Sequence, residues 1–260
     1  MNTRVCCVFA GLCGVAVFAL SAIPSGAQAT EVKEKPAMYS YVANWQFPRD
    51  RWGDVARING VDNTIFQAAL SDGTLVGYGN DVNQVHTPDG ESHDTWWSST
   101  SIAGLMKVLD KLRALPAADT PISLNPTKHW DLVLVSRYYN WKPGPYTGAY
   151  VNVAMYQLKP NADDDAVSTL SKAVVVPMLE KMLADGTILE YEVDTEAIHT
   201  DAPGLFAIVY VTPQPEGIDT VRAAIRASGH ENPLIGAAFD SYVDYSQHRD
   251  ELLKGNGAYK

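Results

Sequence analysis

A nine-residue stretch occurs twice in this chain. Residues 70–78 read LSDGTLVGY, and residues 183–191 read LADGTILEY. The same spacing of 113 positions (72 to 185) joins Asp81 to Asp194 and His86 to His199, and Val108 still matches Val221 far downstream. A constant offset over such a distance indicates an internal duplication, so each half of the chain should fold as a copy of one unit.

Each copy carries the same expected order of elements. In the first copy, apolar and aromatic patterns predict strands over 38–47, 74–86, 94–100 and 131–139, with helices over 51–70 and 101–114. In the second, they predict strands over 150–158, 187–199, 205–212 and 238–245, with helices over 162–183 and 217–227. The Asn59-Gly60 pair should interrupt the first helix. The order β-α-β-β-α-β is the ferredoxin-like motif.

This order predicts an α+β fold in which the two repeats form one barrel. A four-stranded sheet of this kind has one face under its helices and one bare face. Two copies in one chain can press their bare faces together and close an intramolecular α/β barrel, which removes apolar surface from water. A monomer is then adequate, and association into a homodimer through strand edges stays open.

The first 29 residues are interpreted as a signal peptide. Arg4 precedes an apolar run from Val5 to Ile23, and Ala27 and Ala29 fit a signal-peptidase site. The alternative is an uncleaved anchor, since the run is just long enough to span a bilayer. Cleavage would export the protein to the periplasm or the medium. No later segment is apolar enough to cross a membrane, so no membrane association is expected after cleavage.

The other expected boundaries follow from the repeat. They are an N-terminal tail over 30–36, the first repeat over 37–140, a Pro- and Gly-rich linker over 141–148, the second repeat over 149–246 and a polar C-terminal tail over 247–260.

Composition excludes several classes of function. The formal net charge is −10 and no basic run occurs, so nucleic acid is not an expected partner. All three cysteines, Cys6, Cys7 and Cys13, lie in the leader, so the mature chain would have no disulfide and no thiolate site. His93, Asp94 and His129 could approach other ligands, but no ligand-spacing motif supports a metal site, and none is expected.

One part of the chain resembles a known superfamily. Lys159-Pro160 is followed by a helix that carries Pro177-Met178-Leu179, and then by Asp185-Gly186-Thr187-Ile188. This resembles the dimeric α/β-barrel superfamily, and the likeness covers nearly all of the mature chain as a tandem, self-paired version. It implies a range of functions: cofactor-free monooxygenases, polyketide cyclases, haem-handling enzymes, ring-cleavage and muconolactone-type enzymes, and non-catalytic sensors. Fold alone does not choose among these.

The candidate catalytic residues come from the repeated strands. The single-unit cyclases of that superfamily use His and Tyr in the cavity, and His86, His199, Tyr78 and Tyr191 match these by type. Each histidine also stands at a strand end, where it could simply close a turn. Glu190 is the further candidate, as a general base.

Alternation along these strands leaves two faces to choose between. The row with Tyr78 and Tyr191 fits the helix side better. If the other row faces inward, Gly77 and Gly79 leave room on one wall of a pocket, and Glu190 and Glu192 supply carboxylates on the other. The competing interpretation is a solvated edge strand with protective charges.

The six tryptophans lie in the first copy or the linker, which favours an aromatic-lined cavity there. Trp45 and Trp96, with Gly77 and Gly79, are the expected substrate-binding residues. The sequence therefore predicts an exported barrel protein that binds a small apolar or aromatic molecule. As an enzyme it would be a monooxygenase, cyclase or isomerase that uses acid/base chemistry and no cofactor. A non-catalytic binding, sensing or structural protein is the alternative.

Overall fold

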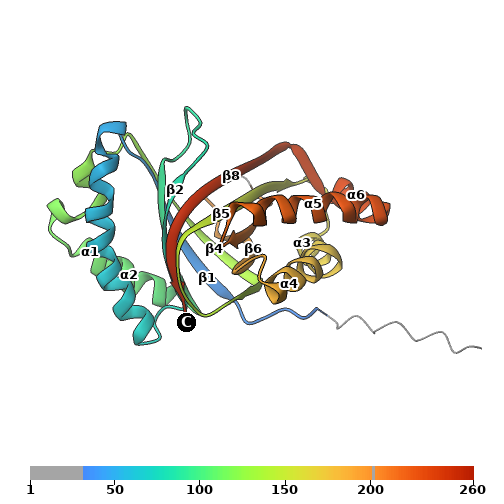
Figure 1. Cartoon of the computed structure of the whole chain (residues 1–260), viewed down its shortest axis with the longest axis horizontal. Coiled ribbons are helices and arrows are strands. Elements are labelled where there is room, and N and C mark those ends of the chain that lie inside the picture. The colour runs from blue at the N-terminus through green and yellow to red at the C-terminus, as the bar shows by residue number, and fades with distance from the viewer. Residues whose placement is uncertain (1–31, 201–202) are drawn as a thin grey trace, which may run out of the picture. The chain divides into compact units, whose positions relative to one another are not determined.

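Eight antiparallel strands close into one barrel in the order β1-β3-β2-β8-β5-β7-β6-β4 (Figure 1). The computed structural model describes residues 32–200 and 203–260, so the expected signal peptide over 1–29 lies outside the described residues. The strands are β1 (Met38–Gln46), β2 (Gly77–Asn83), β3 (His93–Ser99), β4 (Lys128–Trp141), β5 (Gly144–Leu158), β6 (Glu190–Ile198), β7 (Leu205–Thr212) and β8 (Val243–Tyr259).

The two halves repeat one topology. The first half has the strand order β4-β1-β3-β2, and the second half has β8-β5-β7-β6. In both halves, the strands therefore lie in the order fourth, first, third, second. Two seams join the halves, β2 with β8 and β4 with β6. The expected α+β fold of two β-α-β-β-α-β repeats that close one barrel within a single chain is confirmed.

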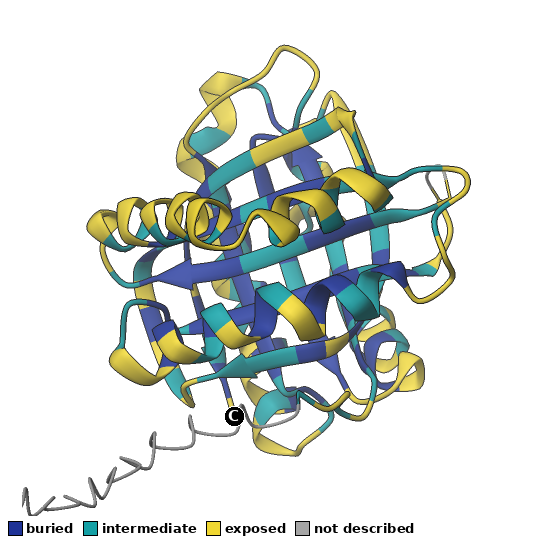
Figure 2. Ribbon diagram, turned by 90° about the vertical axis from the view of Figure 1, so that its right-hand side faces the viewer, coloured by how far each residue is buried: buried dark blue, intermediate teal, exposed yellow. Residues whose placement is uncertain are grey.

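Helices cover the outer surface of each half (Figures 1 and 2). In the first half these are α1 (Trp52–Ser71) and α2 (Ile102–Arg113). In the second half they are α3 (Ala166–Leu170), α4 (Val176–Asp185), α5 (Pro215–Glu231) and α6 (Pro233–Tyr242). A π turn over Ser171–Val175 joins α3 to α4 just before Pro177, and short 3₁₀ turns lie at Arg49–Arg51, Ala117–Asp119 and Pro121–Leu124.

The helices bury apolar stripes against the outward-facing side chains of the strands. Phe66 of α1 and Leu105 of α2 pack with Trp97 of β3, and all three are almost completely buried. In the second half, Leu179 of α4 packs with Tyr191 of β6. Because strand side chains alternate, the opposite row of each strand faces the barrel interior. No helix in the described part of the chain is long and apolar enough to span a membrane.

Four sequence expectations need correction. Residues 247–260 were expected to be a polar tail, yet β8 continues to Tyr259 and pairs with both β2 and β5. The strand expected over 238–245 is mostly helix α6, and the expected linker over 141–148 is mostly strand, since β4 ends at Trp141 and β5 begins at Gly144. Helix α1 is also continuous through Asn59-Gly60, because Gly60 lies on the exposed side of a helix anchored by buried residues on either side.

Candidate functional site

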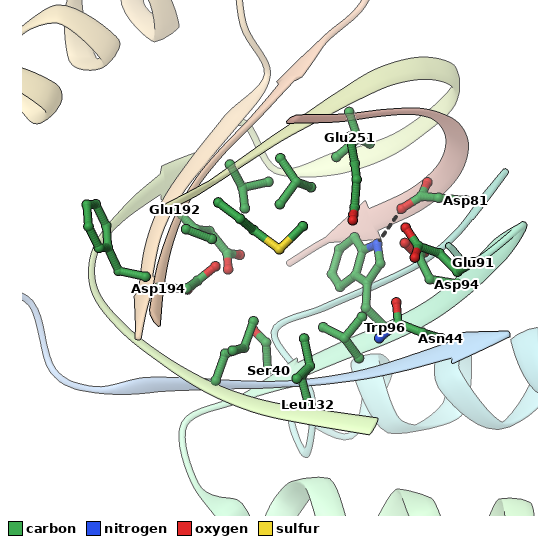
Figure 3. A pocket seen from close by; sticks show the side chains of 18 of the residues that line it. Ser40, Asn44, Asp81, Glu91, Asp94, Trp96, Leu132, Glu192, Asp194 and Glu251 are labelled. Atoms are coloured by element: carbon green, nitrogen blue, oxygen red, sulfur yellow. Dashed lines mark hydrogen bonds between the residues drawn. The ribbon is translucent and has the colours of Figure 1, made fainter. Parts of the chain in front are cut away.

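The barrel encloses a cavity of about 110 Å³. The walls are largely apolar and aromatic, with Trp96, Trp130, Tyr146 and Tyr259 among them, and aliphatic side chains such as Leu132, Val151 and Val209 between them. Carboxyl groups enter the same cavity from several strands and one loop: Asp81, Glu91, Asp94, Glu190, Glu192, Asp194, Glu196 and Glu251. The cavity is therefore an apolar chamber with a concentration of acids (Figure 3).

The repeat explains how two of these acids come to face each other across the barrel. Asp81 on β2 and Asp194 on β6 are equivalent positions of the duplication, and each is on the inward row of its strand. Two residues earlier the halves differ, because Gly79 matches Glu192. The β6 wall therefore carries carboxyl groups where the β2 wall has glycine, and the inward orientation of this row holds in both halves.

The first acidic cluster is built around Asp81 and Asp94, which are directly opposite each other on β2 and β3. The indole Nε1 of Trp96 donates a 3.0 Å hydrogen bond to Asp81 Oδ2, drawn as a dashed line in Figure 3. Asp81 also lies against the backbone of Gly255 on β8, where a Cβ atom would come within 1.4 Å of Asp81 Oδ1. Glycine at position 255 is thus what allows this carboxyl to occupy the seam.

The second cluster, Glu190, Glu192 and Asp194, lies on β6, and Figure 3 places Glu192 and Asp194 on the opposite side of the cavity from Asp81 and Asp94. The carboxyls of Glu192 and Asp194 lie close to each other, with Ser40 near Glu192 and Ser136 near Asp194. The two serine hydroxyls bond other groups, Ser40 Oγ with Ser98 Oγ and Ser136 Oγ with the Val193 carbonyl oxygen. Neither oxygen of Glu190 meets a hydrogen-bond donor among the described residues. The carboxyl of Glu192 lies close to Glu190, and the two can form a hydrogen bond when one of them is protonated.

Burial raises the pKa values of these acids toward or above neutral pH. Loss of hydration raises the pKa of Asp81 to about 7 and that of Asp194 to about 7, although hydrogen bonds from their neighbours oppose the shift. Burial and the neighbouring carboxylates raise the pKa values of Asp94, Glu190 and Glu192 well above the ordinary range. Burial together with Glu91 raises the pKa of Glu251 to about 8. Some of these groups are therefore poised to exchange protons near neutral pH.

Positive charge in the chamber is sparse. Among the described lining residues, Arg249 is the one Lys, Arg or His side chain, and it lies at the exposed end with its Nε 3.8 Å from Glu251. Protonation is therefore the main way in which these acids avoid the cost of burying unpaired negative charge.

Tyr146 supplies a neutral hydrogen-bond donor to the same chamber. Its hydroxyl is buried and has no partner among the residues that the structure describes. Burial first, and then the nearby acids Asp81 and Glu190, raise its pKa well above the ordinary value, so the hydroxyl keeps its proton. An unpartnered buried hydroxyl is costly unless something binds it, so this donor is available to a ligand.

Three of the residues that the sequence indicated for a pocket line the chamber, and two more form its wall in an unexpected way. Glu190, Glu192 and Trp96 face the cavity; that Glu190 is catalytic stays a prediction. Gly77 and Gly79 leave no open room, because a Cβ on them would meet the rings of Tyr259 and Trp96 at 2.5 Å and 2.6 Å. The two glycines instead let these rings pack flat against β2.

The other candidates lie elsewhere. Tyr78 and Tyr191 face the helices: Tyr78 stacks on Phe66, and Tyr191 donates a 2.6 Å hydrogen bond to Glu180. His86 and His199 are exposed at strand ends outside the cavity, and His86 packs edge-on against Trp52. Trp45 lies on the outer face of β1, stacked on His129. The structure therefore does not bring these five residues to the chamber.

Several chamber residues escaped the sequence interpretation. Asp81 and Asp194 carried a readable signal, since they are matched acids of the duplication on the row that contains Glu190. Tyr146 and Tyr259 carried none, because they fall in segments interpreted as linker and tail. Within the described ranges, no three His, Cys, Asp or Glu side chains are arranged to hold a metal ion.

Comparison with known proteins gives likeness of structure only. No protein-family model matches the sequence, and no curated protein matches it. Among solved structures, a candidate monooxygenase from Lactobacillus acidophilus superposes with a TM-score of 0.60 at 12% identity, over 86% of this chain and 96% of that one. A candidate monooxygenase from Fusobacterium nucleatum gives a TM-score of 0.62 at 6% identity, over 87% and 95%.

A third structure, an anthrone oxidase-like protein, superposes with a TM-score of 0.55 at 10% identity, over 85% of this chain and 92% of that one. At such identities the likeness shows the fold and not the chemistry. Strand order, seams and these superpositions agree: the chain has the ferredoxin-like, dimeric α/β-barrel fold, with both units of the pair in one polypeptide.

Proposed function

We propose that the chamber is an active site for cofactor-independent acid–base chemistry on a small, flat, uncharged aromatic compound. The observation that carries this proposal is the set of buried carboxyls, poised near neutral pH, inside an apolar and aromatic cavity. Ionised groups without counter-charges are expensive to bury, and structural need does not explain so many of them in one place.

The size of the cavity narrows the substrate. A cavity of about 150 Å³ can hold benzene, and the chamber measures about 110 Å³. A compound built on a single ring therefore fits the chamber better than one built on three fused rings. The aromatic side chains of Trp96 and Tyr259 would pack against the faces or edges of that ring.

The roles of the residues follow from their positions. Asp81, held by the Trp96 indole, would in its ionised form take a proton from an acidic C–H or phenolic O–H group of the substrate. The hydroxyl of Tyr146, which keeps its proton, would donate a hydrogen bond to the negative oxygen that develops. If the overall reaction is an oxidation, molecular oxygen would accept the electrons of the resulting anion. The likeness in fold to candidate monooxygenases supports this form of the proposal.

The test is proton exchange and oxygen consumption with a panel of single-ring phenols and aryl ketones. Exchange of substrate protons in D₂O is followed by NMR, and oxygen uptake by electrode. We expect Asp81→Asn to lower the rate by about 10²-fold or more. The matched control is the His86→Ala/His199→Ala double variant, which alters exposed side chains away from the chamber and should keep the rate.

Three outcomes would count against the proposal. Equal rates for Asp81→Asn and the unaltered protein would remove this carboxyl from the chemistry. Binding of ring compounds without exchange or oxygen uptake would favour the alternative of a non-catalytic binding protein. A Soret band in the purified protein would point to haem and contradict the absence of a cofactor.

We further propose that the protein is exported, as the leader pattern over 1–29 indicates. Sequencing of the N-terminus of protein recovered from the periplasm or medium should begin at Thr30. Recovery with an intact leader in the membrane fraction would support an anchor instead.

A further inference from the structure

One acid interrupts the apolar stripe of helix α1. The residues of this helix that are buried against the sheet are Val55, Ile58, Asp62, Phe66 and Ala69, at the spacing of one helix face. Asp62 stands in the middle of that face and is only 4% exposed. It makes no hydrogen bond or ion pair to any residue that the structure describes, and its pKa is raised to about 7 by burial alone.

The duplication provides an internal comparison. The equivalent of Asp62 in the second half, 113 positions later, is Val175, which is also buried and ends the π turn between α3 and α4. The fold therefore accepts an aliphatic residue at this position, and an unpaired carboxyl there serves no evident structural purpose. Burying it costs stability, so its retention calls for a function.

Asp62 faces a cavity of about 430 Å³ between the outer face of β1, β3 and β4 and the helices α1 and α2. This cavity is distinct from the barrel chamber, since it is lined by the opposite row of strand residues. Its walls include the aromatic rings of Tyr41, Trp45 and Trp97, and the segment around Ile122 lies at its rim. Tyr41 and Trp97 are stacked, with ring centroids 4.4 Å apart.

A second polar group in this cavity lacks a partner. The Nε1 atom of Trp45, which is 8% exposed, meets no acceptor in the described structure. Two other polar groups of the cavity are engaged: His129 bonds the Asn44 carbonyl oxygen through Nδ1 at 2.9 Å, and its Nε2 lies 3.4 Å from Asp131. Arg113 also lines the cavity, but it is exposed and makes no hydrogen bond or ion pair among the described residues. Asp131 also accepts a hydrogen bond from Tyr41. Asp62 and Trp45 thus present an unpaired acid and an unpaired donor to one aromatic-walled space.

We propose that this outer cavity of the first half is a second ligand site, for a cationic aromatic amine. The ammonium group would pair with the Asp62 carboxylate, the ring would pack among Tyr41, Trp45 and Trp97, and an acceptor on the ligand would take the Trp45 indole hydrogen bond. Aromatic walls favour a cation over an anion as well as a flat shape.

The outer cavity of the second half lacks the features of the proposed ligand site, so the site is assigned to the first half only. A cavity of about 440 Å³ occupies the corresponding place there, but Val175 and Tyr210 stand at the positions of Asp62 and Trp97. The residue opposite Tyr210 is Asn152, where the first half has Tyr41 opposite Trp97. The acid and the aromatic stack are therefore particular to one copy.

The test uses three probes of one shape: 1-naphthylmethylamine, 1-naphthalenemethanol and 1-naphthoate. Binding is measured by calorimetry at pH 7.5, where the first is a cation, the second neutral and the third an anion. We expect the amine to bind best and Asp62→Asn to weaken it about 30-fold or more, as for a buried charge pair that loses one partner. Asp54→Asn, an exposed acid on the same helix, is the matched control and should leave affinity unchanged.

A second variant separates a ligand role from a structural one. Asp62→Val, which installs the residue of the other copy, should abolish binding of the amine and raise the melting temperature by about 2 °C or more. A fall in melting temperature together with unchanged amine affinity in Asp62→Asn would make the carboxyl structural and overturn the proposal.

Proton release provides an independent readout. Binding of a cation should ionise Asp62, so at pH 6 the heat should change between buffers of different ionisation enthalpy. The other titratable groups that face Asp62 across the cavity are Tyr41, Arg113, His129 and Asp131. Equal affinity for the amine and the alcohol would show that the amine does not use this site. So would an Asp81→Asn variant that no longer binds the amine, if the Asp62→Asn variant binds it as well as the unaltered protein does.

Discussion

At the scale of single residues, the chamber is governed by the protonation of its acids. The folded-state pKa values of Asp81 and Asp194, about 7, lie well above the ordinary value of 3.8, so folding favours their protonated forms. The stability that this protonation contributes is fully present below about pH 4 and is lost as pH rises through the folded-state values.

We therefore expect the free energy of unfolding to fall from about pH 4 to about pH 7, by about 1.4 kcal/mol per pH unit for each such group, and to level off above pH 7. Asp194→Asn should flatten this slope, because the amide cannot ionise. Chemical denaturation at a series of pH values measures both effects. A stability that rises over this range would mean that the acids are ionised in the folded protein.

The Tyr146 hydroxyl allows a more local prediction. Tyr146→Phe removes a donor that has no protein partner, so the fold should lose little or no stability. If Tyr146 steadies a developing negative oxygen, turnover should fall by about 10²-fold with little change in KM. Unchanged turnover would assign the donor to packing alone.

At the level of residues, the structure decides between the two rows that the sequence left open, because the row with Glu190 and Glu192 faces the interior. Trp96, which was chosen because all six tryptophans lie in the first copy or the linker, also lines the chamber. That any of these residues binds or transforms a substrate stays a prediction. The histidines could not be placed from sequence, because a repeated His has the same appearance whether it closes a turn or performs catalysis. Which row of a strand points inward depends on the sheet that packs behind it, and a single sequence does not report that.

At the scale of elements, β8 is the strand that the sequence pattern failed to predict over most of its length. Applied to β4, the offset of 113 would have placed a strand near residues 241–254, so the duplication did contain the signal. The segment looked like a tail because its inward side faces acids and its outward side is polar, so neither row has the apolar alternation that identifies a strand. Gly255 and Gly257 lowered the signal further.

Substitution of Gly255 in β8 and of Gly60 in α1 by alanine should change the stability of the protein in opposite directions. A Cβ at position 255 would meet the Asn80 carbonyl oxygen at 2.7 Å and collide with Asp81, so Gly255→Ala should cost about 1–3 kcal/mol. A Cβ at position 60, on the exposed face of α1, would meet nothing within 4 Å. Gly60→Ala should therefore stabilise the protein by about 0.5–1 kcal/mol. Denaturant unfolding compares them, and equal effects would contradict the seam geometry.

At the scale of the whole molecule, the barrel is complete only with both seams. Without residues 243–260, β2 and β5 would each expose an unpaired edge, which favours aggregation. We expect a chain that ends at Tyr242 to elute in gel filtration as an aggregate, and addition of the missing segment as a peptide during refolding to restore a monomer. A soluble monomer with native near-ultraviolet dichroism in the truncated chain would contradict this.

Closure by β8 has a consequence for the order of folding. The ring of hydrogen bonds stays open until β8 pairs with both β2 and β5, so no earlier set of strand pairings completes the barrel. Because β8 needs an edge from each half, its pairing should be a late step that follows the folding of the other strands.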